Sequence, residues 1–487
     1  MSNASTRVAH GTLMRAGGEI VAKVASVAFF VVMARVLTKD AFGVFIFGMS
    51  LSQLVLEFAA VGSQDLIARE VSRDRSRVHD LFYNFLAMKA ALLAALSLAI
   101  CGVIFFANYS DTEVIAIALI TVGTAVEMQT STYYAVFQAH ERNEFVAGTL
   151  IVQRGMTACI GIAVLLAGGG LIAAAAVYCL GTMVGQSAAY LFLHRKVISP
   201  QRQINLDRWV ELMRASVPLG FVSLAYFALI ELDGVLLGFL SSKAEVGVYG
   251  AAYRLVNATM FISWSFSGAM VPWLARHNEG SGATSLSRGY ELGLKVLSAM
   301  LMPIGAAYIV FATPLIHTLY GSSYDAAIAP LRWLGAMTVL YGINNFVAVL
   351  AIQREHPADF ALPTAFIFVQ NLIFNLILIP HYHATGAAFN AVLSGVLLAI
   401  WTSIRAQRRI GRVNFVRALA TPVLGSAAMA GVVFLLGPTL TPLPIIAGGL
   451  TYAIVFVVLE RVVFPADFRF YVNALPARFR LPRSAPS

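Results

Sequence analysis

Charged residues are scarce in this chain. They make up 12% of its 487 residues, whereas 59% are hydrophobic, and the mean hydropathy is +0.77. Because soluble domains carry about 25% charged residues, this composition excludes an ordinary soluble protein. A bilayer core about 30 Å thick needs about 20 apolar residues per helical span, and the chain contains many such runs. We therefore expect an all-α polytopic membrane protein.

Cysteine is also rare. The three cysteines, Cys101, Cys159 and Cys179, all lie in apolar runs, and an odd number of buried thiols excludes a disulfide framework or a cysteine metal cluster. The sequence has no paired nucleophile and base, no phosphate-cradling glycine loop, no acidic metal pair and no nucleic-acid motif. We expect no enzyme activity, no cofactor, no metal site and no nucleic-acid partner. Transport would draw its energy from an ion gradient or from the substrate's own gradient.

Lysine and arginine are nearly absent from one set of loops, which carries only Lys39 and Lys243. The other set holds clusters such as 69–77, 195–214, 405–417 and 461–483. The positive-inside rule makes the basic set cytoplasmic, with both termini inside and an even number of spans. We count fourteen candidate spans. The start of the chain lacks the pattern of a cleavable signal peptide, so we expect the first apolar run to remain as a span.

One hairpin occurs twice. Residues 36–54 (VLTKDAFGVFIFGMSLSQL) align with residues 240–258 (LSSKAEVGVYGAAYRLVNA), 204 positions later. Lys39 falls on Lys243, Gly43 on Gly247, and Gln53 meets Asn257. Each copy lies between two long apolar segments, as expected for a helix–turn–helix in each of two related halves.

This repeat predicts two six-helix lobes related by a parallel pseudo-two-fold axis, followed by two further helices. We place the N-lobe at 1–200 (spans 1–6), the C-lobe at 201–410 (spans 7–12), and spans 13–14 with a cytoplasmic tail at 411–487. The link between the lobes, 195–214, contains the amphipathic run 205–214 (NLDRWVELMR). It either lies on the membrane surface or is a solvated linker.

Several stretches, in order, give the chain a family resemblance. They are 34–37 (ARVL) with 42–43 (FG); 69–74 (REVSRD); 233–237 (DGVLL) with 246–249 (VGVY) and 252–255 (AYRL); and 375–380 (NLILIP) with 386–388 (GAA). The chain resembles the polysaccharide transporter or oligosaccharide flippase family (O-antigen flippase-like) of the multidrug/oligosaccharidyl-lipid/polysaccharide exporter superfamily.

The resemblance implies a fourteen-helix, two-lobed fold that works by alternating access in a bacterial cytoplasmic (inner) membrane. It implies a lipid-linked oligosaccharide of undecaprenyl-pyrophosphate type as substrate, moved for lipopolysaccharide or other surface polysaccharide biosynthesis. Its partners would be that substrate, membrane lipids, a polysaccharide polymerase or other assembly proteins, and protons or sodium ions if transport is ion-coupled.

Ionisable residues inside spans are costly and mark functional sites or ion pairs. In the first half, Arg15, Glu19 and Lys23 share one helix face at spacing i, i+4, i+8. At about 1.5 Å per residue, Lys23 reaches mid-membrane. Three further charges are also near mid-depth: Lys89, Glu127 and Arg154. The cations Arg15, Lys23, Lys89 and Arg154 could hold a pyrophosphate; alternatively, Glu19 and Glu127 pair with them as structural contacts.

In the second half, Glu231 and Asp233 match the depth of Arg254 on the next span. We expect an Asp233–Arg254 or Glu231–Arg254 ion pair. Lys295 lies nearer the inner side and is a further candidate for the cavity. Amide side chains could bind sugar hydroxyls or join helices together; the candidates are Gln53, Asn257, Asn344, Asn345, Gln370 and Asn371.

Two other functions compete with a flippase. A cation-coupled multidrug antiporter of the same superfamily needs acidic groups that dominate the cavity, such as Glu19, Glu127 or Asp233, and the mid-depth excess of cations speaks against it. A membrane glycan polymerase or ligase usually needs a large external loop, whereas the outer loops here are short and nearly uncharged.

Overall fold

The protein is described by a computed structural model that covers residues 2–60, 62–107, 109–201, 203–278, 283–353, 358–410 and 413–468. The helices are α1 (Ser2–Val36), α2 (Lys39–Ala60), α3 (Ser63–Arg73), α4 (Val78–Phe106), α5 (Asp111–Ala139), α6 (Asn143–Leu166), α7 (Leu171–Phe192), α8 (Trp209–Leu240), α9 (Lys243–Asn278), α10 (Ala283–Val310), α11 (Ala312–Tyr320), α12 (Ile328–Gln353), α13 (Ala358–Ile410), α14 (Phe415–Leu436) and α15 (Pro442–Val463). The fold class predicted from composition, an all-helical membrane protein, is confirmed.

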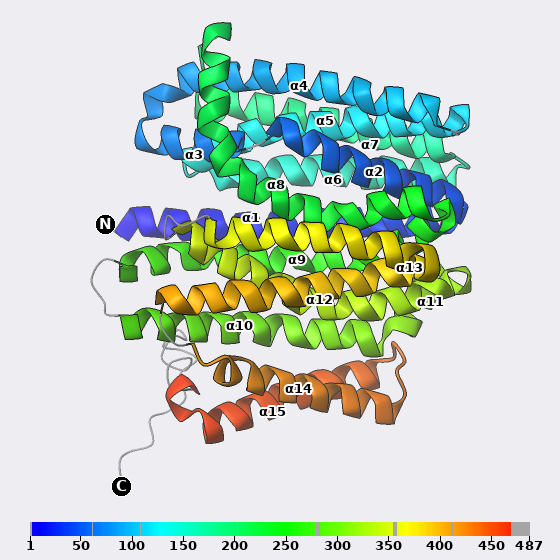
Figure 1. The fold of residues 1–487 in the computed structure, drawn as a ribbon, viewed down its shortest axis with the longest axis vertical. Coiled ribbons are helices and arrows are strands. Elements are labelled where there is room, and N and C mark those ends of the chain that lie inside the picture. The colour runs from blue at the N-terminus through cyan, green and yellow to red at the C-terminus, as the bar shows by residue number, and fades with distance from the viewer. Residues whose placement is uncertain are drawn as a thin grey trace.

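Ten stretches of the described chain are long and apolar enough to cross a membrane. One of them, 362–405, lies in α13, which turns back at His383, where φ is 50°. A positive φ is uncommon outside glycine, and here it marks the turn between the two arms of the helix. The two arms of α13, yellow and orange in Figure 1, therefore count as two spans. With α1, α8 and α9, which are 35, 32 and 36 residues long, the helices are consistent with the fourteen predicted spans.

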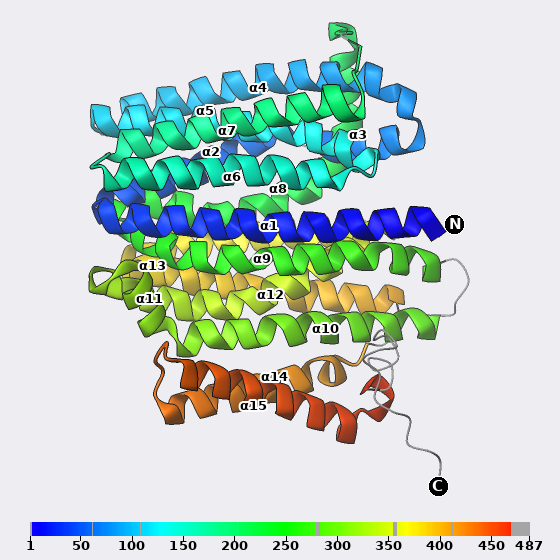
Figure 2. The same ribbon diagram turned by 180° about the vertical axis from the view of Figure 1, so that it is seen from behind.

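The helix packing repeats from one half to the other. In the first half α1 packs on α6, α2 on α5, α4 on α5, and α5 on α7. Six spans later the same pairs recur as α8 on α13, α9 on α12, α10 on α12, and α12 on α13. The halves meet through α1, α2, α8 and α9, which lie in the middle of the bundle (Figures 1 and 2). This is the predicted arrangement of two lobes, and α14 and α15 extend it by packing on α10.

The two copies of the repeated hairpin contact each other. A Cβ added to Gly43 would lie 1.8 Å from the carbonyl oxygen of Lys243, and one added to Gly247 would lie 2.6 Å from that of Lys39. Each glycine thus packs against the first residue of the other copy's second helix, because Lys39 begins α2 and Lys243 begins α9, as a two-fold axis requires. Only glycine lets the two backbones approach this closely. We call this end of the bundle the outer end, following the predicted orientation, and the opposite end the inner end.

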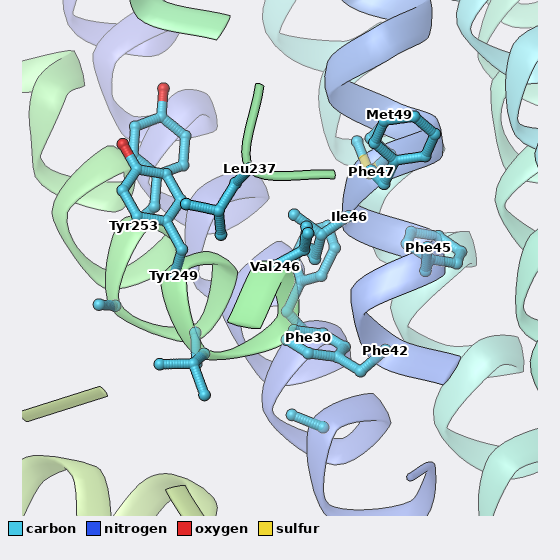
Figure 3. Packing of buried hydrophobic residues seen from close by; sticks show 14 of the residues in the cluster. Phe30, Phe42, Phe45, Ile46, Phe47, Met49, Leu237, Val246, Tyr249 and Tyr253 are labelled. Carbon is cyan, nitrogen blue, oxygen red and sulfur yellow. The ribbon is translucent and has the colours of Figure 1, made fainter. Parts of the chain in front are cut away.

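Buried apolar side chains form three clusters. The largest draws on both lobes, mostly from the outer halves of the central helices, and Figure 3 shows part of it around α2 and α9, including Ile46 and Val246. The second belongs to the inner end of the N-lobe, with Leu212 from the start of α8. The third joins the inner parts of α10 and α12 to the start of α14. The lobes therefore share their largest apolar core toward the outer end, whereas toward the inner end each lobe has its own core, and only the start of α8 crosses from the C-lobe to the N-lobe core.

Candidate functional site

Two charges predicted at mid-depth form an ion pair in the N-lobe. The Arg154 guanidinium on α6 binds the Glu127 carboxylate on α5, and the Tyr178 hydroxyl on α7 donates to the other Glu127 oxygen at 3.1 Å. The side chains of Arg154 and Glu127 are 22% and 28% exposed. The pair is therefore partly open, unlike the fully buried side chains of the apolar clusters.

Lys23 links the two lobes. Its Nζ on α1 donates to Asn257 Oδ1 on α9 at 2.9 Å. Arg254, one helical turn before Asn257, lies over the ring of Phe30 at 4.4 Å and donates to Met49 Sδ at 3.5 Å. The Nε of Arg254 is buried and has no hydrogen-bond partner among the described residues. A guanidinium placed on aromatic and thioether groups is poorly compensated.

These three cations lie close enough to affect one another. Arg154 and Arg254 both repel the charge of Lys23, whereas Glu19 and Glu127 attract it, and Glu231 attracts Arg254. We call Lys23, Arg154 and Arg254 the interlobe cations. Within the described chain, Arg154 alone among them is hydrogen-bonded to a carboxylate. Such a group of fixed cations at the junction of two lobes suits an anion that must leave water.

The other predicted cations lie elsewhere. Lys89 is fully buried inside the N-lobe and donates to Ser131 at 2.7 Å. Lys295 is 1% exposed and binds Glu460 and Asp467, each at 2.8 Å. Both therefore stand apart from the interlobe cations, because nearer polar groups of their own lobe or of the last helices satisfy them. The side chain of Arg15 is outside the described residues.

The two acids predicted to pair with Arg254 behave differently. Asp233 accepts hydrogen bonds from Asn375 at 2.7 Å and from the Tyr249 hydroxyl at 3.3 Å, so its partners are neutral groups and not Arg254. Glu231 is 7% exposed; it lies near Arg254 and Ser50, and among the described residues it forms no direct ion pair with Arg254. Asp233 instead lines a small apolar pocket between α8, α9, α12 and α13.

Most of the predicted sugar-binding amides bond to neighbouring helices. Asn344 donates to the Gly395 carbonyl at 3.1 Å, and Asn345 donates to Ser263 Oγ at 3.1 Å. Asn371 donates to Ser394 at 3.0 Å, and Gln370 accepts from the same hydroxyl at 3.0 Å. These contacts join helices to one another, which is the second of the two roles predicted for these amides. Asn257 has its bond to Lys23, and Gln53 is half-buried on α2.

A set of polar contacts at the outer end was missed by sequence reasoning. Lys243 of α9 binds both oxygens of Glu113 on α5, at 2.6 and 2.7 Å, and lies 4.9 Å from the centre of the Tyr109 ring. Lys39, its repeat equivalent, lies 5.8 Å from the Tyr324 ring in the other lobe. The signal was present, because the only two lysines of the outer loops occupy equivalent positions of the repeat.

Arg35 adds a second cross-lobe contact at this end. From the last turn of α1 it donates to the Leu319 carbonyl at 2.7 Å and to the Thr318 carbonyl, near the C-terminal end of α11, where a cation is favoured by the helix dipole. Within the described chain, no group of three His, Cys, Asp or Glu side chains could hold a metal ion.

The fold is shared with solved membrane transporters. The chain superposes on the lipid II flippase MurJ in an inward closed conformation with a TM-score of 0.75 at 13% identity, covering 93% of this chain and 99% of that one. It also superposes on an inward-facing multidrug MATE transporter of the MOP superfamily with a TM-score of 0.64 at 15% identity, covering 82% and 100%. The chain therefore has the helical fold of these two structures.

Comparison of the sequence with known families identifies the family of this chain. Residues 8–278, more than half of the chain, match the polysaccharide biosynthesis protein family, and the chain belongs to it. The probable flippase AglR of Haloferax volcanii is 25% identical over 239 residues, 47% of this chain and 50% of AglR. The probable low-salt glycan biosynthesis flippase Agl15 of the same organism is 23% identical over 212 residues, 42% and 43% of the two chains. The match spans about half the length of these relatives.

Proposed function

We propose that this protein is a flippase that moves a lipid-linked oligosaccharide with a pyrophosphate group across the cytoplasmic membrane. The observation that carries the proposal is the group of interlobe cations Lys23, Arg154 and Arg254. The family match and the relatives that are named flippases support the substrate class. An undecaprenyl carrier is the finer part of the proposal and rests on the family resemblance.

The physical argument concerns charge. A pyrophosphate that enters a region of low dielectric loses water, and fixed cations must replace that hydration. Lys23 offers a point charge and the two arginines offer forked donors that fit phosphate oxygens. Within the described residues no carboxylate forms an ion pair with Arg254, and Lys23 donates to the neutral Asn257 amide and is attracted by nearby acids. An arriving anion would compensate both cations.

We further propose alternating access by rocking of the N-lobe (1–200) against the C-lobe (201–410). The shared apolar cluster toward the outer end and the separate clusters toward the inner end support this motion. Glycine contacts and the Lys243–Glu113 pair hold the outer end together, so opening there would break them. The substrate would enter from the inner end, which the positive-inside rule assigns to the cytoplasm together with both termini.

The test is replacement of an interlobe cation. Lys23→Ala should abolish surface glycan in a strain that lacks the native gene, because the substrate phosphate loses a cation, while membrane yield stays near that of the unaltered protein. Lys23→Arg keeps the charge and should retain export. Arg332→Ala is a matched control, since it removes an exposed cation from the outer end of α12.

Normal glycan export by Lys23→Ala at normal yield would contradict the proposal. Loss of yield together with export in Lys23→Ala would assign Lys23 to structure alone.

The antiporter alternative has one observation in its favour. Asp233 is 2% exposed and its described partners are amides and a hydroxyl, a neutral setting in which a carboxylate could take up a proton or a sodium ion. The same residue could instead serve ion coupling in the flippase. Asp233→Asn should leave glycan export intact if export is uncoupled and abolish it if ion binding there drives transport.

A further inference from the structure

The link between the lobes is docked on the N-lobe by polar contacts. Arg208 binds Asp80 at the start of α4, at 2.5 Å. Asn84, one turn further along α4, donates to the Gln203 carbonyl at 3.1 Å and accepts from the Asn205 backbone at 2.8 Å. The link is therefore attached at a defined place and is not a free solvated chain.

The first turns of α8 continue this docking. Leu212 is buried and Trp209 and Met213 are partly buried in the inner N-lobe cluster. Figure 1 shows the start of α8, in green, running across the inner ends of α3 and α4 before the helix turns into the bundle. Because α8 continues directly into a span, its first turns must lie at the level of the membrane surface.

A second edge of the same segment is exposed and apolar. Leu206 is 65% exposed and Val210 is 59% exposed, and Val217 follows seven residues after Val210, on the same side of the helix. Arg214 is exposed between them. The polar residues Asp207 and Glu211 lie at a different angle around the helix axis from Val210. The segment thus has a packed face, an exposed apolar edge and a polar edge, which is the pattern of a helix in the membrane interface.

Basic residues flank the apolar edge along the chain. Arg195 and Lys196, three and four residues after the end of α7, are exposed, as is Arg214. We propose that residues 204–217 together with Arg195 and Lys196 form an interfacial anchor that binds anionic phospholipid headgroups of the inner-end leaflet. The apolar edge enters the boundary between headgroups and acyl chains, and the cations bind the lipid phosphates by charge attraction.

A lipid surface explains both features of the anchor. A protein partner would have to fit an edge that lies at the membrane surface beside the spanning helices, whereas lipid is already there. The excess of cations matches anionic headgroups. The anchor would hold the start of α8, and with it the junction of the two lobes, at a fixed depth. The anchor would bind lipid in the same way whichever substrate the protein carries.

Depth is tested by spin labels in nanodiscs that contain phosphatidylglycerol. The native cysteines are first replaced, and a label is attached at Val210→Cys or, as the matched control on the polar edge, at Glu211→Cys, which is 71% exposed. We expect the label at 210 to be accessible to oxygen and shielded from a water-soluble nickel chelate, and the label at 211 to show the reverse. Nickel access at 210 would mean a solvated linker, and shielding from both reagents would mean a protein contact; either result overturns the proposal.

Headgroup binding is tested by the unfolding temperature in nanodiscs of phosphatidylcholine with and without phosphatidylglycerol. Bound anionic lipid stabilises the folded state, so the unaltered protein should unfold at a higher temperature when phosphatidylglycerol is present. The triple variant Arg195→Ser, Lys196→Ser, Arg214→Ser should lose most of this gain, although all three side chains are exposed and the fold should persist. An unchanged gain in the triple variant would refute anionic headgroup binding by these residues.

Discussion

At the scale of the residue, the partner of each membrane charge decides its role. Lys23, Lys89 and Lys295 all looked alike in the sequence, as cations within apolar runs. In the folded chain Lys295 forms ion pairs with two carboxylates, and Lys89 donates a hydrogen bond to a serine inside its own lobe. Lys23 donates a hydrogen bond to an asparagine of the other lobe. Depth along a helix could be counted from the sequence, but the direction of the side chain and the identity of its neighbours could not.

The Arg154–Glu127 pair gives a prediction that separates structure from binding. Arg154→Ala leaves the Glu127 carboxylate without its cation and should lower the yield of folded protein. Adding Glu127→Gln removes the stranded charge and should restore the yield. If Arg154 binds substrate, glycan export stays absent in this double variant; the measurement is surface glycan against membrane yield.

The single variant Glu127→Gln is the control, because it shows how yield and export respond when the Glu127 carboxylate alone is removed. Recovery of both yield and export in the double variant would show that Arg154 acts only as the partner of Glu127.

At the scale of the element, the two copies of the repeated hairpin build the outer contact of the lobes. Gly43 and Gly247 were recognised in the sequence as repeat equivalents, and the structure adds that they face each other. Small residues on both helices bring the backbones together, and the lysines that begin α2 and α9 then reach aromatic rings of the opposite lobe. One short motif, used twice, therefore closes one end of the molecule.

Gly43→Ala should disrupt this contact. The added Cβ would lie 1.8 Å from a backbone oxygen, so the helices must separate, and overpacking of this kind costs about 1–3 kcal/mol. We expect a lower unfolding temperature in detergent. Gly102→Ala is the matched control, because a Cβ there has nothing within 4 Å and alanine favours a helix.

An unfolding temperature for Gly43→Ala equal to that of Gly102→Ala would rule out a tight glycine contact between α2 and α9.

The last two helices are attached to the C-lobe by a buried charge network. Asp467 is 1% exposed and forms ion pairs with Lys295 at 2.8 Å and Arg417 at 3.1 Å. Arg288 also forms an ion pair with Asp467. Lys295→Met should therefore leave the buried Glu460 carboxylate without its cation and remove one of the three cations around Asp467, which should destabilise the protein by about 3–5 kcal/mol. The readout is the unfolding temperature, with exposed Arg461→Ala as control. A Lys295→Met protein as stable as the control would show that the network contributes little.

At the scale of the whole molecule, the repeat organises the bundle. The pairing of helices recurs in both halves, and the central helices α1, α2, α8 and α9 carry both the apolar outer cluster and most of the interlobe polar contacts (Figure 2). A lobe that moves as a unit changes these contacts together. Motion of one lobe against the other would then open one end of the molecule while the other stays closed.

Orientation in the membrane is the prediction at this scale. A reporter enzyme that is active only outside the cytoplasm should be active when fused after Asp111 or Ser322 and silent after Arg75 or Arg409, because arginine and lysine concentrate in the inner loops. Each fusion is checked for equal expression by immunoblot. The opposite pattern would invert the assignment of inner and outer ends and with it the proposed direction of transport.

Class, repeat and approximate span count could be predicted from the sequence, because hydropathy and loop charge are read locally along the chain. The Arg154–Glu127 pair was among the alternatives that residue depth allowed. The partners of Asp233 and Lys295 could not be predicted, because they lie 142 and 172 positions away in the chain. The contact of Lys243 with Glu113, 130 positions apart, was hidden for the same reason.

The sequence by itself determined that this chain is a membrane protein of two related helical halves, since burying apolar runs in lipid and satisfying the backbone leave only helices. Only the tertiary structure decided which charges face each other at the junction of the lobes, and that the largest core shared by the halves lies toward one end. The physical reason is that hydropathy belongs to a segment, whereas an ion pair or a close glycine contact belongs to two helices whose relative rotation and depth are fixed by packing.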